Sequence, residues 1–217
     1  DITVRRALPR RQRRTIGAWC FADHMGPAQA TPTHGLDVGP HPHCGLQTVT
    51  WLTQGEVLHH DSLGTSQLIA PGQLNLMTAG CGIAHSEFTP GEAAAELHLL
   101  QLWIALPDDA RWQPPHFEQH AELPEAAGDG WRARVLIGGL DGIVSPAAAY
   151  TPIVGAELRI DPFGTAVVPL RRDFEHALLA AVGEVETAGD RLAPGPLLYL
   201  GAGRDSIAVR AGAAGAV

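Results

Sequence analysis

Short apolar runs of β-strand length recur along the whole chain. Five clear ones are LQTVTWLTQG (46–55), QLNLMTAG (73–80), LHLLQLWIAL (97–106), ARVLIGG (133–139) and PLLYLGAG (196–203). Turn-forming residues bound nearly every run, and 25 Gly and 17 Pro are spread along the sequence. Short strands joined by tight turns are typical of sandwiches and barrels. The pattern therefore predicts an all-β fold.

A polar, proline-rich stretch at 107–130 interrupts this pattern. Such a composition is typical of a crossing between domains. We therefore expect two domains, with an N-terminal one at 1–118 and a C-terminal one at 119–217.

The two halves share motifs at similar spacing. Gly-Glu-Val occurs at 55–57 and 183–185, and Ala-Pro-Gly occurs at 70–72 and 193–195. In both halves an Ala-Gly pair begins eight residues after that proline. Repeated motifs at fixed spacing indicate a repeated structural unit, so the sequence predicts two copies of one β-unit.

Two pairs of polar residues in the first half have the spacing of metal ligands. The segment PHPH contains His41 and His43, and GIAHSE contains His85 and Glu87. Alternate residues of a strand share a face, so each pair can point into one barrel. Three imidazoles and a carboxylate suit iron, nickel, copper, manganese or zinc and leave positions open for water, substrate or dioxygen. The pattern predicts a catalytic metal site; the alternative is four buried polar residues satisfied by hydrogen bonds.

The second half lacks this set. Counting equal steps from the shared glycines places other residue types at the four corresponding positions: Pro169, Arg171, Ala208 and Arg210. Residues needed only for the fold would be expected to recur in the second copy. We therefore interpret the four polar residues as functional and the domain at 119–217 as a copy without metal ligands.

The charge balance limits the classes of partner. The formal net charge is −8, and the fifteen basic residues are all Arg, six of them within 5–14. A phosphate-binding surface needs a clustered positive field, so we expect no direct binding to nucleic acid or to a membrane. We interpret the arginine-rich segment as a solvated edge strand; the alternative is a nucleic-acid-binding arm.

Cysteine usage and hydropathy indicate a cytoplasmic protein. Three cysteines, Cys20, Cys44 and Cys81, are too few and too scattered for a secreted disulfide scaffold. No run approaches the roughly 18 apolar residues of a membrane span. A monomer of two domains is the simplest expected state.

Four segments together resemble a known family: FADHMGP (21–27), PHPHCGLQTVTWLTQGEVLHHDSLG (40–64), IAPGQLNLMTAGCGIAHSE (69–87) and LQLWIALP (100–107). They are similar to the pirin family of bicupins. This resemblance implies two stacked cupin (jelly-roll) β-barrels with one divalent transition metal in the N-terminal barrel. It also implies that the family's metal ligands fall on His41, His43, His85 and Glu87. Fe(II) is the expected metal, with Ni, Mn, Cu and Zn as alternatives.

The resemblance implies one of two activities. Some members are quercetin 2,3-dioxygenases, which open a flavonol ring with dioxygen and release carbon monoxide. In that case the substrate is a small flavonol-like aromatic, and Glu87 is the catalytic base that takes the proton of its 3-hydroxyl group. The alternative is a metal-dependent regulatory or redox-sensing protein that modulates a transcription factor or a metabolic enzyme as its protein partner.

Several residues depart from the family pattern or stand near the predicted site. Cys44 and Cys81 replace residues that are usually Arg, and Gln47 replaces Glu, which weakens docking of an anion or a regulator. We interpret the two cysteines as small buried residues; the alternative is a redox-responsive pair near the metal.

The positions of other side chains in the sequence indicate their roles. His24 and His59 are expected to be structural hydrogen-bonding residues, with cavity lining as the alternative for His59, and His98 is expected in the core. His34 is expected in a loop over the mouth of the site. Three apolar side chains are candidates either for lining an aromatic pocket or for filling a closed barrel: Trp51, Leu76 and Met77.

Overall fold

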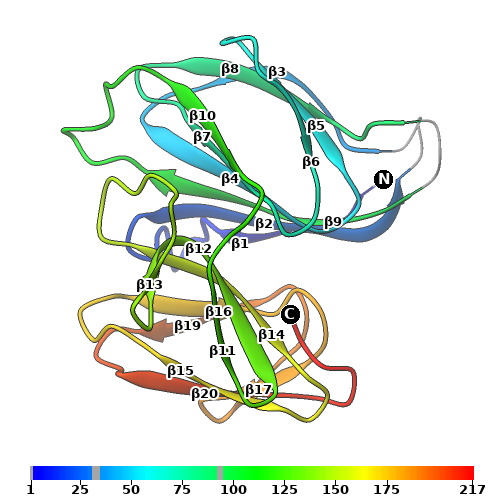
Figure 1. The fold of residues 1–217 in the computed structure, drawn as a ribbon, viewed down its shortest axis with the longest axis vertical. Coiled ribbons are helices and arrows are strands. Elements are labelled where there is room, and N and C mark those ends of the chain that lie inside the picture. The colour runs from blue at the N-terminus through cyan, green and yellow to red at the C-terminus, as the bar shows by residue number, and fades with distance from the viewer. Residues whose placement is uncertain (1, 31–34, 92–94) are drawn as a thin grey trace. The chain divides into compact units, whose positions relative to one another are not determined.

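The computed structural model describes residues 2–30, 35–91 and 95–217, and these residues form strands and no helix (Figure 1). The all-β prediction is therefore confirmed. In these ranges there is accordingly no helix with the length and apolar character needed to cross a membrane. The chain divides into two compact units, 1–122 and 123–217. The stacking of two barrels stays a prediction.

Unit 1 is built from two antiparallel sheets (Figure 1). The larger sheet has, in spatial order, β1 (Val4–Leu8), β2 (Trp19–Ala30), β9 (Ala95–Ala105), β4 (Leu46–Gln54), β7 (Leu74–Thr78) and β10 (His116–His120). The smaller sheet has β3 (Asp37–His43), β8 (Ile83–Phe88), β5 (Val57–Asp61) and β6 (Ser66–Ile69). The predicted domain boundary after residue 118 falls within β10, and all five residues of β10 pair with β7.

Alternation along β4 gives the larger sheet a polar stripe on one face. Thr48 and Thr50 alternate with the buried Val49 and Trp51. The Thr50 hydroxyl reaches Glu87 of β8, so the threonine face is turned toward the smaller sheet. Consecutive strand residues point to opposite faces, and Trp51 therefore lies on the other side of the sheet.

An apolar cluster joins the two sheets away from the polar stripe. It contains Ala30, Leu52, Val57, Ile69, Leu97 and Leu99, contributed by five strands of both sheets. Burying each large aliphatic side chain of such a cluster stabilises a fold by about 1.5 to 3 kcal/mol. The sheets are held together by this cluster, which leaves a polar interior available elsewhere in unit 1.

Unit 2 repeats part of this topology. Its strands are β11 (Glu125–Gly128), β12 (Trp131–Leu140), β13 (Ile143–Val144), β14 (Val154–Ile160), β15 (Thr165–Pro169), β16 (His176–Leu179), β17 (Val185–Thr187), β18 (Asp190–Leu192), β19 (Leu197–Gly201) and β20 (Ser206–Ala211). The sheet β15-β20-β17-β18 has the strand order of β3-β8-β5-β6, and the pair β16-β19 corresponds to β4-β7. The shared order supports the internal repeat.

The residues of β20 that correspond to His85 and Glu87 of β8 differ by one position from those obtained by counting along the sequence. Ala208 and Arg210 of β20 are exposed, whereas Ile207 and Val209 are buried in the core of unit 2. The predicted equivalence of Ala208 and Arg210 with the inward-facing His85 and Glu87 is therefore wrong. Side chains alternate with a period of two, so one extra residue between turn and strand reverses the face. The inward positions of β20 are apolar and provide no metal ligand.

Candidate metal centre

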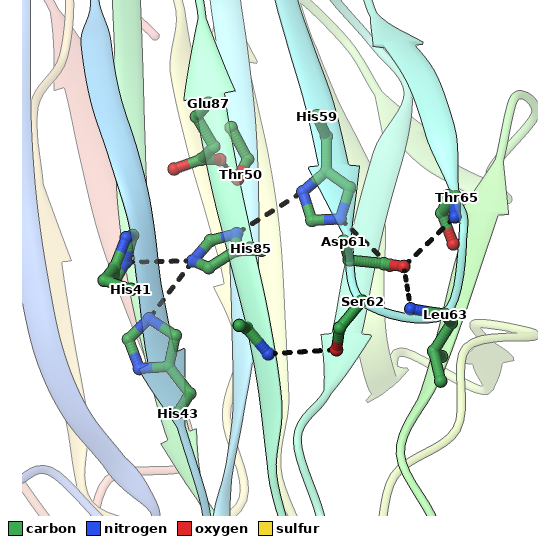
Figure 2. A network of polar contacts seen from close by, with 11 residues as sticks. His41, His43, Thr50, His59, Asp61, Ser62, Leu63, Thr65, His85 and Glu87 are labelled. Atoms are coloured by element: carbon green, nitrogen blue, oxygen red, sulfur yellow. Dashed lines mark hydrogen bonds and ion pairs between the residues drawn. The ribbon is translucent and has the colours of Figure 1, made fainter.

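Strands β3 and β8 bring three histidines together. His41 on β3 lies directly opposite His85 on β8 in the antiparallel register, and His43 follows two residues after His41. The Nε2 atom of His85 lies 3.1 Å from Nε2 of His41 and 3.1 Å from Nε2 of His43 (Figure 2). Three imidazole nitrogens from two neighbouring strands thus converge on one point.

The convergence fits a divalent metal ion. Two ligands at right angles on an ion with bonds of about 2.1 Å lie about 3.0 Å apart, close to the observed nitrogen separations. Nitrogen lone pairs at this distance repel one another unless a proton or a cation lies between them. Three imidazoles suit zinc, copper, iron and nickel, so these residues form a suitable donor set for such an ion.

Burial keeps two of these imidazoles neutral. Desolvation, followed by the proximity of His41, lowers the pKa of His43 to about 4. Desolvation, followed by the proximity of His41 and His43, lowers the pKa of His85 to about 3. At pH 7 both rings are therefore uncharged, and a neutral imidazole has the free lone pair that metal binding requires.

Glu87 lies two residues after His85 on the same face of β8. Glu87 is 5% exposed, and its carboxylate accepts a hydrogen bond of 2.7 Å from the hydroxyl of Thr50. Burial raises the pKa of Glu87, while the Thr50 hydrogen bond acts in the opposite direction. Figure 2 shows the carboxylate beside His85, with Thr50 on one side of it. The ligand role of Glu87 stays a prediction, because its carboxylate groups with His59 and His85 rather than with the three-histidine cluster.

A series of hydrogen-bonding contacts from His59 and Asp61 approaches His85 from the other side, and the sequence analysis did not predict that these side chains meet. His59 of β5 is 2% exposed, and its Nδ1 lies 3.4 Å from Nδ1 of His85. Its Nε2 lies 3.2 Å from Oδ2 of Asp61 (Figure 2). The hydrogen-bonding role expected for His59 is confirmed. The available signal was the His-x-Asp spacing in LHHD, which places both side chains on one face of a strand.

Two aromatic side chains contact these histidines directly. The ring of Trp103 contacts His43 edge-on, with ring centroids 5.0 Å apart. Phe21 stacks on the ring of Trp103, with centroids 3.9 Å apart. Phe117 stacks on His59 at 4.6 Å. Aromatic contacts of this kind fix ring orientation, so the imidazoles are held from both sides of the cluster.

The predicted apolar lining is only partly correct. Met77 pairs with Thr48 across β4 and β7 and packs with Ile83, on the side of the sheet that faces β8. Leu76 pairs with Val49, and it shares with Trp51 the face turned away from Glu87. Strand alternation therefore excludes Trp51 and Leu76 from the surroundings of the histidines.

The histidines predicted to be structural follow their expected environments where the structure describes them. His98 is 2% exposed, which confirms its core position, and its Nε2 lies 2.6 Å from Nε2 of the equally buried His24. His34 lies outside the described residues.

The interpretation of Cys44 and Cys81 as buried residues is wrong. Both are free and exposed, whereas Cys20 is partly buried. The amide of Gly45 donates to the carbonyl of Gly80 at 2.8 Å, so the turns that carry the two exposed cysteines are neighbours. Their pairing as a redox-responsive couple stays a prediction.

Two of the three thiols are expected to react rapidly with a thiol reagent such as Ellman's reagent. Cys44 and Cys81 are accessible, while burial raises the pKa of Cys20 and its Sγ faces the Trp103 carbonyl at 3.6 Å. Since the thiolate is the reactive form, Cys20 should label slowly. Cys44→Ser and Cys81→Ser should each remove one fast equivalent, and Cys20→Ser should remove the slow one. Three fast thiols would contradict this assignment.

Known proteins similar to this chain share its fold over nearly its whole length. A family model described as Pirin matches residues 1–104. A Pseudomonas aeruginosa protein named "Putative quercetin 2,3-dioxygenase" is 51% identical over 95% of this chain, and a Caulobacter vibrioides "Pirin-like protein" is 39% identical over 88% of it. The chain spans 65% and 69% of the lengths of these two relatives. A crystal structure of quercetin 2,3-dioxygenase from Acinetobacter baumannii aligns with a TM-score of 0.93 and 43% identity, covering 98% of this chain and 71% of that one.

Proposed function

This chain belongs to the pirin family, and from that premise we propose that it is a metal-dependent oxygenase of the quercetin 2,3-dioxygenase type. The observation that carries the proposal is the convergence of three imidazoles beside a buried carboxylate. The relatives that carry quercetin 2,3-dioxygenase names support the reaction class. The proposed substrates are a small flavonol-like aromatic molecule and dioxygen.

His41, His43, His85 and Glu87 are the proposed metal ligands. Four ligands from one side leave positions open on an octahedral ion for the substrate. We propose Fe(II) as the metal, with Ni, Mn, Cu and Zn as alternatives. When bound, the metal would polarise the flavonol hydroxyl group and supply the redox chemistry toward dioxygen.

Glu87 is the proposed catalytic base. Its raised pKa, caused by burial, makes the carboxylate a better proton acceptor than an exposed glutamate. The Thr50 hydroxyl donates to one carboxylate oxygen and leaves the second available for the proton of the flavonol 3-hydroxyl. Transfer of that proton leaves an electron-rich flavonolate, which is the form that reacts with dioxygen.

Net charge and cysteine chemistry support a proposal for the cellular setting. The net charge of −8 disfavours nucleic acid and anionic membranes as partners. The free cysteines fit a reducing compartment. We therefore propose a cytoplasmic enzyme, with a monomer as the simplest state.

The proposal is tested by dioxygen consumption with quercetin after reconstitution with Fe(II), and separately with Ni, Mn and Cu. We expect uptake that is matched by loss of the flavonol absorbance and by release of carbon monoxide. His43→Ala should abolish it, and His60→Ala, which alters the neighbouring residue of His59 on β5, should not. Stoichiometric metal binding without uptake would instead favour the regulatory, redox-sensing function and overturn the enzymatic one.

A further inference from the structure

A chain of three side chains leads from the three-histidine cluster to a carboxylate. The Nδ1 atoms of His85 and His59 are 3.4 Å apart, and Nε2 of His59 is 3.2 Å from Oδ2 of Asp61. Figure 2 shows these contacts as successive dashed lines that lead from His41 through His85 and His59 to Asp61. Neither His59 nor Asp61 belongs to the proposed ligand set, so their placement requires a separate explanation.

The tautomers along this chain follow from a single requirement. A neutral imidazole has one protonated nitrogen and one free lone pair. If Nε2 of His85 offers its lone pair to a metal, the proton is on Nδ1, which can donate only to the unprotonated Nδ1 of His59. His59 is then protonated on Nε2 and donates to the carboxylate of Asp61. Metal binding through Nε2 of His85 therefore fixes the positions of the ring protons of both His85 and His59.

The backbone holds the carboxylate end of this chain in place. The Asp61 side chain is fully buried, and one of its oxygens accepts hydrogen bonds from the amides of Leu63 and Thr65 at 2.9 and 3.1 Å. Asp61 lies opposite His85, and His59 lies opposite Glu87, in the register of β5 and β8. The turn after β5 thus anchors the acceptor, and the strand pairing sets its distance from His85.

We propose that His59 and Asp61 are positioning residues that fix the tautomer and ring orientation of His85 and strengthen it as a metal donor. Outer hydrogen-bond partners of metal-bound histidines act in this way, and a carboxylate at the end makes the imidazole more basic. The inference rests on the metal site of the proposed function and is independent of its substrate.

A competing possibility is that His59 is itself a ligand, because His59, His85 and Glu87 also form a compact group. The geometry favours the positioning role. The two nitrogens of an imidazole point in different directions, so an ion held by Nδ1 of His85 and by His59 could not also contact the Nε2 cluster. Binding there would leave His41 and His43 without the third nitrogen that faces them.

The test measures Ni(II) affinity of the full chain by competition with a chromophoric chelator, together with X-ray absorption of the Ni-loaded protein. His59→Phe preserves stacking on Phe117 and removes both nitrogens. We expect one Ni(II) per chain, about 10- to 100-fold weaker affinity and an unchanged number of nitrogen ligands. His60→Phe, on the adjacent position of β5, is the matched control and should bind as the wild type does.

Two further variants separate orientation from packing. His59→Asn places an amide oxygen near the position of Nδ1 and should recover part of the affinity lost in His59→Phe. Asp61→Asn preserves side-chain size and should give an intermediate loss of Ni(II) affinity. It tests the positioning role even if the His59→Phe variant fails to fold.

Each contrary outcome has a distinct meaning. Wild-type Ni(II) affinity in both His59→Phe and Asp61→Asn would overturn the positioning role. Loss of one nitrogen ligand from saturated His59→Phe would show that His59 binds the metal. Failure of the wild type to consume dioxygen with quercetin would count against the oxygenase proposal and leave this inference intact, whereas failure of the wild type to bind Ni(II) would overturn both.

Discussion

Replacing His85 by Ala is expected to lower the affinity for a divalent metal by more than about 100-fold, which exceeds the usual cost of removing an outer-shell partner. His85 is the central member of the cluster, because its Nε2 lies 3.1 Å from both of the other imidazoles. Without it, His41 and His43 remain as two half-buried donors on one strand. Equilibrium dialysis with Ni(II), followed by metal analysis, measures the loss, and dioxygen uptake with quercetin should disappear with it.

The matched control for this change is His98→Ala. His98 is also buried in unit 1, but its Nε2 faces Nε2 of His24 and not the three-histidine cluster. His98→Ala also removes one buried imidazole, so it should lower the free energy of unfolding while metal affinity is preserved. Unchanged Ni(II) binding in His85→Ala, or an equal loss in both variants, would contradict the assignment of the three-histidine cluster as the metal site.

Glu87→Gln is expected to reduce kcat/KM for quercetin-dependent dioxygen uptake by about 100- to 10,000-fold, the range usual for loss of a general base. The amide oxygen of Gln can still accept the Thr50 hydrogen bond, so the side chain should stay in place. The amide cannot take up the flavonol proton. Metal should still bind through the three imidazoles, with weaker affinity because one anionic ligand has been removed.

The readout therefore combines initial rates with metal content. Glu56→Gln, an exposed substitution in the same unit, is the control for loss of one negative charge and should behave as the wild type. A Glu87→Gln protein that retains full metal content and full turnover would exclude Glu87 as the base. A protein that retains turnover per bound metal but loses metal would assign Glu87 as a ligand only.

Local periodicity explains why the strands and the histidine pairs could be predicted from the sequence. Turn residues bound the apolar runs, and a period of two puts His41 with His43, and His85 with Glu87, on common faces. These relations depend only on neighbours along the chain. The same spacing rule places His59 and Asp61 of LHHD on one face of a strand.

Contacts between distant strands could not be predicted in this way. The Thr50 hydroxyl that holds Glu87, the facing Nδ1 atoms of His59 and His85, and the exposure of Cys44 all depend on which strands pair and in which register. A shift of one residue reverses every side chain of a strand, as the misassigned positions 208 and 210 demonstrate. Spacing along the chain therefore sets which side chains share a face, whereas packing of the two sheets sets which of them meet and which reach solvent.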